Sequence, residues 1–172
     1  MKKLVLLFSL MCCLQCSSER EYTHIKNAFK NISFKKPDGT LFTNENLKNK
    51  VTFINFWFER CPPCLAEFDA LNGLYNKYKD NKDFQFISFT YESEEDIDRI
   101  AKAHHLNYPI AHSDQEKIQA LISGYPTNII TDQAGEIALI KSGVAVDKDK
   151  INKEFDNVYS KKVERLLFAQ KN

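Results

Sequence analysis

Cysteine is scarce in this chain of 172 residues, and its placement is the most informative feature of the sequence. Of the five cysteines, three crowd the first 16 residues, which leaves Cys61 and Cys64 as the only pair in the rest of the chain. One such pair cannot supply the four ligands of a structural zinc site. A bond between them would close a ring too small to restrain the unfolded chain much. The domain must therefore fold on its hydrophobic core and not on a disulfide framework.

An excess of one charge is also missing. Lysine and arginine number 24 against 23 acidic residues, and 22 against 23 once Lys2 and Lys3 are set aside. This balance creates no large positive field for nucleic acid or an anionic membrane surface, so we expect no nucleic-acid partner. The composition, 43% hydrophobic and 27% charged, fits one soluble globular domain with a sizeable core.

The apolar run near the N-terminus is too short to cross a membrane. It extends over 11 residues from Leu4 to Leu14, where a spanning helix needs roughly 20. Two lysines precede it and a polar stretch follows, which is the layout of a secretory signal. Cysteines close the run, as in bacterial lipoprotein signals, and Cys16 fits the lipidated position best because the polar segment SSERE follows it.

These features predict three regions and a location. Residues 1–16 are expected to be a signal peptide of lipoprotein type, residues 17–31 a tether, and residues 32–172 the folded domain. We expect the protein to be exported to the periplasm or cell envelope and anchored to a membrane through its N-terminal lipid.

Apolar runs and turn signals predict strands that alternate with helices. The runs 51–58 and 84–91 are rich in β-branched and aromatic residues, as buried strands are. A helix is expected between them, from about Pro62 to Lys79. The other expected elements are two short strands around a turn at 37–39, a helical stretch at 44–49, a helix at 94–105 opened by Ser93 and Asp96, a strand at 108–113, a short helix at 114–123, a hairpin at 126–143 and a long helix from about Asp147. The class is α/β with a mixed central sheet flanked by helices.

The cysteine pair falls where the strand 51–58 ends and the next helix begins. Open α/β sheets place their active sites at such an end. Cys61, at the cap, is expected to be exposed and reactive, because unpaired N–H groups and the helix dipole favour a thiolate there. Cys64 lies one turn inside, on the apolar face with Phe68 and Leu71, and should be sheltered. This asymmetry suits disulfide exchange, in which Cys61 attacks a substrate disulfide and Cys64 resolves the mixed disulfide.

Two segments carry a family resemblance. NLKNKVTFINFWFERCPPCLAEFDAL and, much later, GYPTNIITDQAGEI resemble the TlpA/ResA-like family of membrane-anchored, thioredoxin-fold thiol-disulfide oxidoreductases. The resemblance extends from Ile32 to the C-terminus and keeps the strand, Trp57, the cysteine pair, the Pro-Thr pair and the Asp-x-x-Gly turn in the family's order. It implies a thioredoxin-like fold with an N-terminal hairpin and an inserted strand and helix between Cys64 and Pro126.

The resemblance also implies supporting residues. Tyr125–Pro126 should be a cis peptide that faces the cysteines and leaves neighbouring backbone free to pair with a substrate strand. Glu67 matches a glutamate near the family's active site, although an ideal helical count places it about 60° from the core direction, so a solvated carboxylate stays an alternative. Asn55 stands where thioredoxin has a buried aspartate, which makes Glu67 the better candidate to handle protons for Cys64. Arg60 replaces an aromatic residue of the family.

The expected function is the reduction of protein disulfides without a cofactor. The family implies an inner-membrane thiol as electron donor and proteins such as apocytochrome c as substrates. Pro62 and Pro63 offer no N–H to a Cys61 thiolate, which favours a reducing pair. The alternative is a copper-handling module of thioredoxin fold without disulfide turnover, although domains of the SCO type use C-x-x-x-C and a distal histidine. A peroxiredoxin would need threonine where Phe58 stands.

Overall fold

The computed structural model describes residues 25–36, 39–143 and 145–169. The expected signal peptide, the expected lipidation site Cys16 and residues 17–24 of the expected tether lie outside these residues. Within them, no helix is both long enough and apolar enough to pass through a bilayer.

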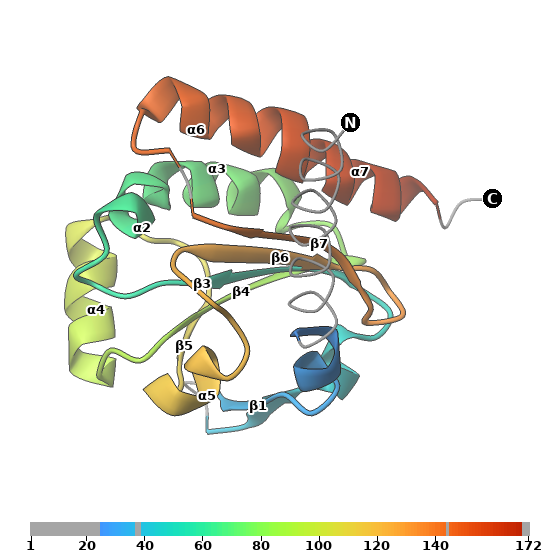
Figure 1. Cartoon of the computed structure of the whole chain (residues 1–172). Helices are drawn as coiled ribbons and strands as arrows, with labels where there is room; N and C mark the ends of the chain where they lie inside the picture. The colour runs from blue at the N-terminus through green and yellow to red at the C-terminus, as the bar shows by residue number, and fades with distance from the viewer. Residues whose placement is uncertain (1–24, 37–38, 144, 170–172) are drawn as a thin grey trace, which may run out of the picture.

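A five-stranded mixed sheet forms the centre of the domain, in the order β5-β4-β3-β6-β7 (Figure 1). Strands β3, β4 and β5 are parallel, and β6 and β7 run antiparallel to β3 and to each other. The strands are β3 (Val51–Phe56), β4 (Phe84–Thr90), β5 (Ile110–His112), β6 (Thr127–Thr131) and β7 (Ile137–Ser142). A separate hairpin joins β1 (Ser33–Lys35) to β2 (Leu41–Thr43). The predicted mixed sheet, N-terminal hairpin and inserted strand and helix are confirmed.

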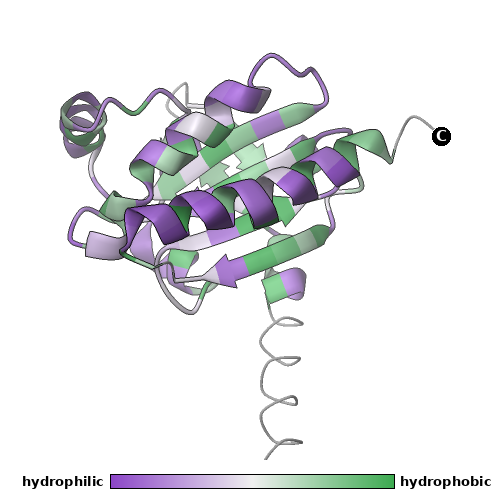
Figure 2. Cartoon of the chain, turned by 90° about the horizontal axis from the view of Figure 1, so that it is seen from above, coloured by the Kyte–Doolittle hydropathy of each residue, from purple (hydrophilic) through white to green (hydrophobic). Residues whose placement is uncertain are grey.

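Alternation along the buried strands divides the core into two clusters. In β3, Phe53 joins the cluster beneath the helices on one face, and Ile54 joins the cluster on the other face. The first cluster is covered by α3 (Phe68–Tyr78), α4 (Glu94–Ala103), α6 (Lys148–Glu154) and α7 (Lys161–Phe168). The second is covered by the β1–β2 hairpin, η1 (Asn44–Leu47), α5 (Gln115–Gln119) and a helix at residues 25–29. Viewed from above, α6 and α7 are largely hydrophilic on their outer side and lie over strands rich in hydrophobic residues (Figure 2).

Local signals explain several element boundaries. The Ser93 hydroxyl accepts a hydrogen bond from the Asp96 N–H at 3.1 Å and so caps α4, as predicted. The turn between β6 and β7 needs Gly135, which has a φ of 80°. The Asp132 carboxylate accepts hydrogen bonds from two backbone N–H groups in the same turn.

Three elements differ from the sequence-based expectation. The helix expected from Pro62 to Lys79 is divided at Glu67 into α2 (Pro62–Ala66) and α3. The C-terminal helix contains a π-helical segment, η2 (Phe155–Ser160), between α6 and α7. Residues 25–31, expected to be part of the tether, pack on the domain instead, because Ile25 and Phe29 are buried in the second cluster.

Candidate active site

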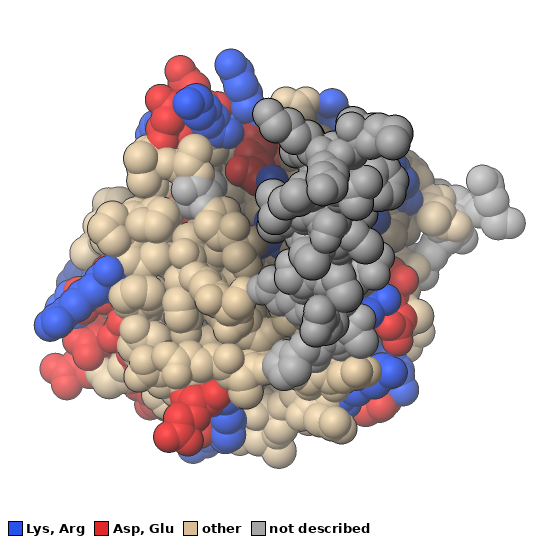
Figure 3. Space-filling view, in the orientation of Figure 1, with Lys and Arg blue, Asp and Glu red and all other residues tan. Residues whose placement is uncertain are grey.

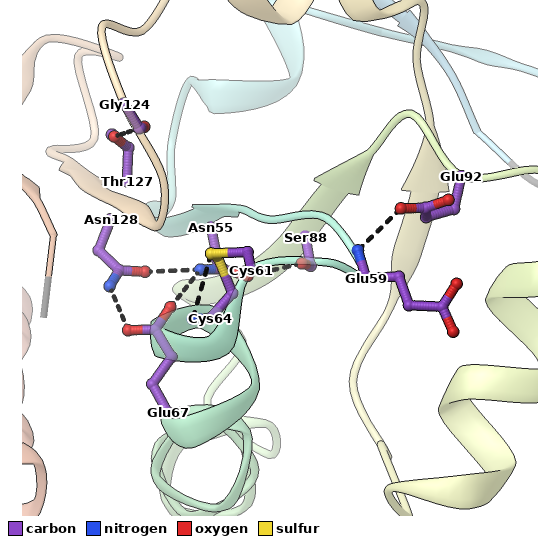
Figure 4. Close-up of a disulfide and its surroundings, with 10 residues drawn as sticks. All are labelled: Asn55, Glu59, Cys61, Cys64, Glu67, Ser88, Glu92, Gly124, Thr127 and Asn128. Atoms are coloured by element: carbon purple, nitrogen blue, oxygen red, sulfur yellow. Dashed lines mark hydrogen bonds between the residues drawn. A yellow bond between two sulfur atoms is a disulfide. The ribbon is translucent and has the colours of Figure 1, made fainter. Parts of the chain in front are cut away.

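A disulfide between Cys61 and Cys64 lies at the N-terminus of α2 (Figure 4). Cys61 is the N-cap residue, with extended backbone, and its Sγ accepts a hydrogen bond from the Cys64 N–H at 3.3 Å. The two intervening residues, Pro62 and Pro63, have no N–H to offer. The sequence predicted this capping arrangement correctly.

The two cysteine residues differ less in exposure than expected. Cys61 is 4% exposed and Cys64 is fully buried, so the expectation of an exposed Cys61 is corrected. In the oxidised state Cys61 is bonded to Cys64 and belongs to the same apolar cluster as Trp57 and Phe68. The ordering of the two cysteines is as predicted, because Cys61 keeps the solvent contact that Cys64 lacks.

The Tyr125–Pro126 peptide is cis, as the family resemblance implied. Gly124 and Thr127, which bracket it, lie in the surroundings of the disulfide (Figure 4). The carbonyl of Pro126 accepts a hydrogen bond from the Gly143 N–H at 2.7 Å, and the Thr127 hydroxyl donates to the Gly124 carbonyl at 2.7 Å. These contacts fix the loop in place before β6.

Three half-buried aromatic rings meet beside this loop. Phe58 stacks on Tyr91 with 5.6 Å between centroids and meets Tyr125 edge-on at 5.0 Å, and Tyr91 and Tyr125 lie 6.3 Å apart. Burial raises the pKa of Tyr125 to about 12. We call these three residues the aromatic rim. Phe58 follows β3, Tyr91 follows β4 and Tyr125 precedes β6. All three therefore lie at the edge of the sheet that carries the disulfide.

Glu67 is fully buried, which removes the alternative of a solvated carboxylate. Its Oε1 accepts a hydrogen bond from the Asn55 amide, and its Oε2 accepts one from the Asn128 amide, both at 2.9 Å. Ser88 in turn donates to Oδ1 of Asn55 at 2.9 Å (Figure 4). The ideal helical count failed here because the helix is interrupted at Glu67, where φ is −90° and ψ is −5°. Glu67 is the C-cap residue of α2, and its N–H donates to the Cys64 carbonyl at 3.3 Å, so a single helical turn joins the two residues.

Opposing effects act on the Glu67 carboxyl. Burial raises its pKa to about 8, while the hydrogen bonds from Asn128 and Asn55 act in the other direction. The negative charge of Glu154 adds to the effect of burial. The result is a carboxyl that can exchange a proton near neutral pH, which is what a buried thiol next to it requires.

Charged residues gather outside the aromatic rim. The Arg99 guanidinium donates to both carboxylate oxygens of Glu59, at 2.8 and 3.0 Å, and lowers the Glu59 pKa. The Glu59 N–H donates to the Glu92 carboxylate at 2.7 Å. Arg60, next to Cys61, is exposed. This network holds the segment that leads from β3 into the cysteines.

Sequence reasoning missed Asn128 and Ser88 as members of the site. Asn128 is 73 residues from Asn55 in the chain, and only the strand register brings the two amides together. Polar residues inside strands that are otherwise buried were the available signal. The part of the chain that the structure describes contains no group of three histidine, cysteine or acidic side chains able to hold a metal ion.

Comparison with known proteins agrees with this geometry. The family model Redoxin matches residues 25–165. The thioredoxin-like protein YneN of Bacillus subtilis is 30% identical over 122 residues, which cover 69% of this chain and 71% of that protein. The thiol-disulfide oxidoreductase ResA of Bacillus cereus is 29% identical over 123 residues, or 70% of each protein.

Solved structures share the fold. A thiol:disulfide interchange protein of the thioredoxin family from Chlorobium tepidum has a TM-score of 0.60 at 23% identity, and the match covers 80% of this chain and 94% of that one. StoA from Bacillus subtilis has a TM-score of 0.56 at 20% identity, covering 73% and 93%. With its disulfide-linked cysteine pair in a thioredoxin fold, the chain belongs to the Redoxin family and, within it, to the TlpA/ResA-like thiol-disulfide oxidoreductases.

Proposed function

We propose that this oxidoreductase is an exported reductant of protein disulfides, in which Cys61 is the nucleophile and Cys64 the resolving cysteine. The observation that carries the proposal is a fully buried carboxyl, Glu67, at the C-cap of the same short helix as the buried Cys64 and three residues after it. A resolving thiol has to lose its proton inside the protein, and this carboxyl is the group placed to receive it.

The reaction transfers two electrons from the protein to the substrate. The Cys61 thiolate attacks one sulfur of a substrate disulfide; that S–S bond breaks, a mixed disulfide forms and the first substrate thiolate leaves. Cys64 then gives its proton to the Glu67 carboxylate, and its thiolate attacks the Cys61 sulfur. The second substrate thiolate leaves and takes up a proton. The product is the Cys61–Cys64 disulfide that the structure contains.

The surface around the disulfide suits a protein substrate. Several half-buried residues there are uncharged, among them Pro63, Leu65 and the aromatic rim. In Figure 3 uncharged side chains cover most of the left and central part of the visible face that no grey atoms hide, and charged side chains gather toward its borders. An extended segment with apolar side chains can dock on such a surface and place its disulfide at Cys61.

The helix cap supports the reducing direction. The prolines at the first two helical positions leave the Cys64 N–H as the hydrogen-bond donor to Cys61 Sγ. A weakly stabilised thiolate does not favour the reduced form, unlike in a strong oxidant. We therefore expect a reduction potential nearer about −270 mV than about −120 mV.

The cellular setting is proposed from the N-terminal sequence and the relatives. The signal-like residues 1–16 support export to the periplasm or cell envelope, with lipidation at Cys16 and residues 17–24 as the remaining tether. In that setting the pair would be recharged by an inner-membrane thiol donor, and apocytochrome c is a candidate substrate. Palmitate labelling of the full chain and of Cys16→Ser tests the anchor.

Two measurements test the function itself. Equilibration with dithiothreitol or glutathione gives the potential of the pair, and turnover on a protein disulfide gives the activity. A potential above about −150 mV would make the protein an oxidant and overturn the proposed direction. Tight Cu(I) binding without disulfide turnover would favour the copper-handling alternative.

A further inference from the structure

A row of polar side chains crosses the face of the central sheet that α3 and α6 cover. The strand register places Ser88 opposite Asn55, Asn55 opposite Asn128, and Asn128 opposite Lys141. Ser88, Asn55 and Asn128 are buried, and Phe53, two residues before Asn55 on the same face, belongs to the apolar core. Buried polar groups in an apolar layer destabilise the fold unless they form hydrogen bonds. Each donor in this row therefore needs an acceptor, and each acceptor a donor.

The donors of the row are matched to a carboxylate. The Asn55 amide uses both hydrogens, one on Glu67 Oε1 and one on Asn128 Oδ1, each at 2.9 Å. The Asn128 amide donates to Glu67 Oε2, and Ser88 donates to Asn55 Oδ1. Each carboxyl oxygen of Glu67 therefore receives an amide hydrogen. These bonds offer no acceptor to a carboxylic acid O–H.

A protonated Glu67 disturbs this arrangement. Its O–H would need an acceptor, and Asn128 can provide one by turning its amide over so that Oδ1 faces Glu67. That turn places the NH₂ groups of Asn128 and Asn55 against each other. The amide pair thus favours the carboxylate, while burial favours the acid.

Other titratable groups also face the carboxyl. Glu154, on α6, is ion-paired with Lys141 on β7, and its charge acts on Glu67 in the same direction as burial. Tyr108 and Tyr159 are buried, and burial raises the pKa of both hydroxyls, so they stay neutral near neutral pH. The two amides are the groups that oppose burial: each donates to its own oxygen of Glu67, and the bond from Asn128 has the larger effect on the Glu67 pKa.

We infer that Asn128, acting with Asn55, is a positioning residue of this site, which fixes the Glu67 carboxyl beside Cys64 and decides its protonation state. Its use in catalysis rests on the proposed function, because the fixed carboxylate is the acceptor of the Cys64 proton. The positioning itself does not depend on turnover and is measurable in the resting disulfide form.

The direct test follows the titration of Glu67 by carbon-13 NMR of its side-chain carboxyl in the oxidised full domain, with Glu67→Gln used to assign the signal. Asn128→Leu keeps the side-chain volume and removes the amide. We expect the Glu67 midpoint to rise by about one to two pH units, the loss of one hydrogen bond to a charged group. The matched control is Asn76→Leu, which removes an exposed asparagine that accepts from Asn107 at 3.1 Å. It should leave the midpoint at the wild-type value.

A second variant protects the test against misfolding. In Asn128→Ser the new side chain is smaller than asparagine and fits the strand, but its hydroxyl cannot reach Glu67 as the amide does. The titration midpoint of Glu67 should therefore rise in this variant as well. An unchanged midpoint in either folded variant overturns the inference. A change in thermal stability alone does not support it, because any buried asparagine would produce that effect.

Activity separates this inference from the proposed function. The pH dependence of mixed-disulfide resolution should contain a limb that disappears in Glu67→Gln. This limb should move to higher pH in Asn128→Leu, and the double variant should behave as Glu67→Gln alone. A limb present in the wild type but unmoved in Asn128→Leu overturns the positioning role and leaves the function standing. Absence of any disulfide turnover overturns the function, while the NMR midpoint still decides the inference.

Discussion

The Sγ of Cys61 accepts a hydrogen bond from the backbone N–H of Cys64 at 3.3 Å, across two prolines that have no N–H. A cap side chain normally draws on the second and third helical positions, and here the second is Pro63. We expect the Cys61 pKa in the reduced protein to be lowered little, because few N–H groups can stabilise its thiolate, and we expect Cys61 and Cys64 to titrate as a coupled pair. Thiolate absorbance against pH measures it.

Restoring the missing donor should make the pair more oxidising. Pro63→Ala adds an N–H at the second helical position, which should lower the Cys61 pKa and raise the reduction potential. Pro62→Ala is the matched control, because an N–H at the first position points less well at the cap side chain. Equal shifts in both variants would show that loss of proline rigidity, and not the new donor, is responsible.

Substitution of either cysteine should stop the reaction at a different step. Cys61→Ser should abolish disulfide reduction, because the residue with the remaining solvent contact is gone. Cys64→Ser should accumulate mixed disulfides with a protein substrate, since attack on Cys61 is removed. Non-reducing gels and mass spectrometry distinguish the outcomes. Wild-type turnover by Cys64→Ser would reverse the assigned roles.

Much of the fold could be predicted because its information is local in the sequence. The two central strands β3 and β4 are rich in β-branched and aromatic residues, and Ser93 and Asp96 signal the cap of α4. The cysteine pair was placed correctly for the same reason, since a strand end and a helix start adjoin in the chain. The helix at residues 25–29 was missed because it is short and is fixed by packing against the second cluster.

The buried side of the site could not be predicted, because it depends on distant register. Nothing near Asn128 in the sequence shows that its amide meets Asn55, which is 73 residues away. The depth of Glu67 was also hidden, because a helical count assumes an unbroken helix and the interruption falls on this residue. Both missed features, the Asn128–Asn55 contact and the burial of Glu67, depend on where the fold places polar side chains. Hydrophobic periodicity in the sequence carries no information about that placement.

Loss of a ring from the aromatic rim should raise KM more for protein disulfides than for small disulfides. Tyr125→Ala removes a ring that contacts both Phe58 and Tyr91 beside the disulfide. We expect KM for a protein disulfide to rise by about tenfold or less, with little change for a small aromatic disulfide that needs no docking surface. Leu41→Ala is the control, since Leu41 is 58% exposed on the β1–β2 hairpin. Equal losses on both substrates would indicate damage to the cysteines and not to docking.

The buried Glu67 carboxyl should make stability depend on pH. Its pKa rises from the ordinary 4.5 to about 8 in the folded protein, so the native state binds more protons than the unfolded state between these values. The stabilisation by the protonated carboxyl is therefore complete below about pH 4.5 and is lost as the pH rises toward 8. Glu67→Gln keeps a neutral side chain at every pH. The free energy of unfolding of this variant, relative to that of the wild type, should therefore rise with pH by at most about 1.4 kcal/mol per pH unit across this window. Urea unfolding of both oxidised proteins at several pH values measures the difference. Glu164→Gln, at a half-buried glutamate paired with Lys77, is the control for carboxylate loss. A difference that stays constant with pH would show that Glu67 is ionised throughout, with its two amide hydrogen bonds outweighing burial.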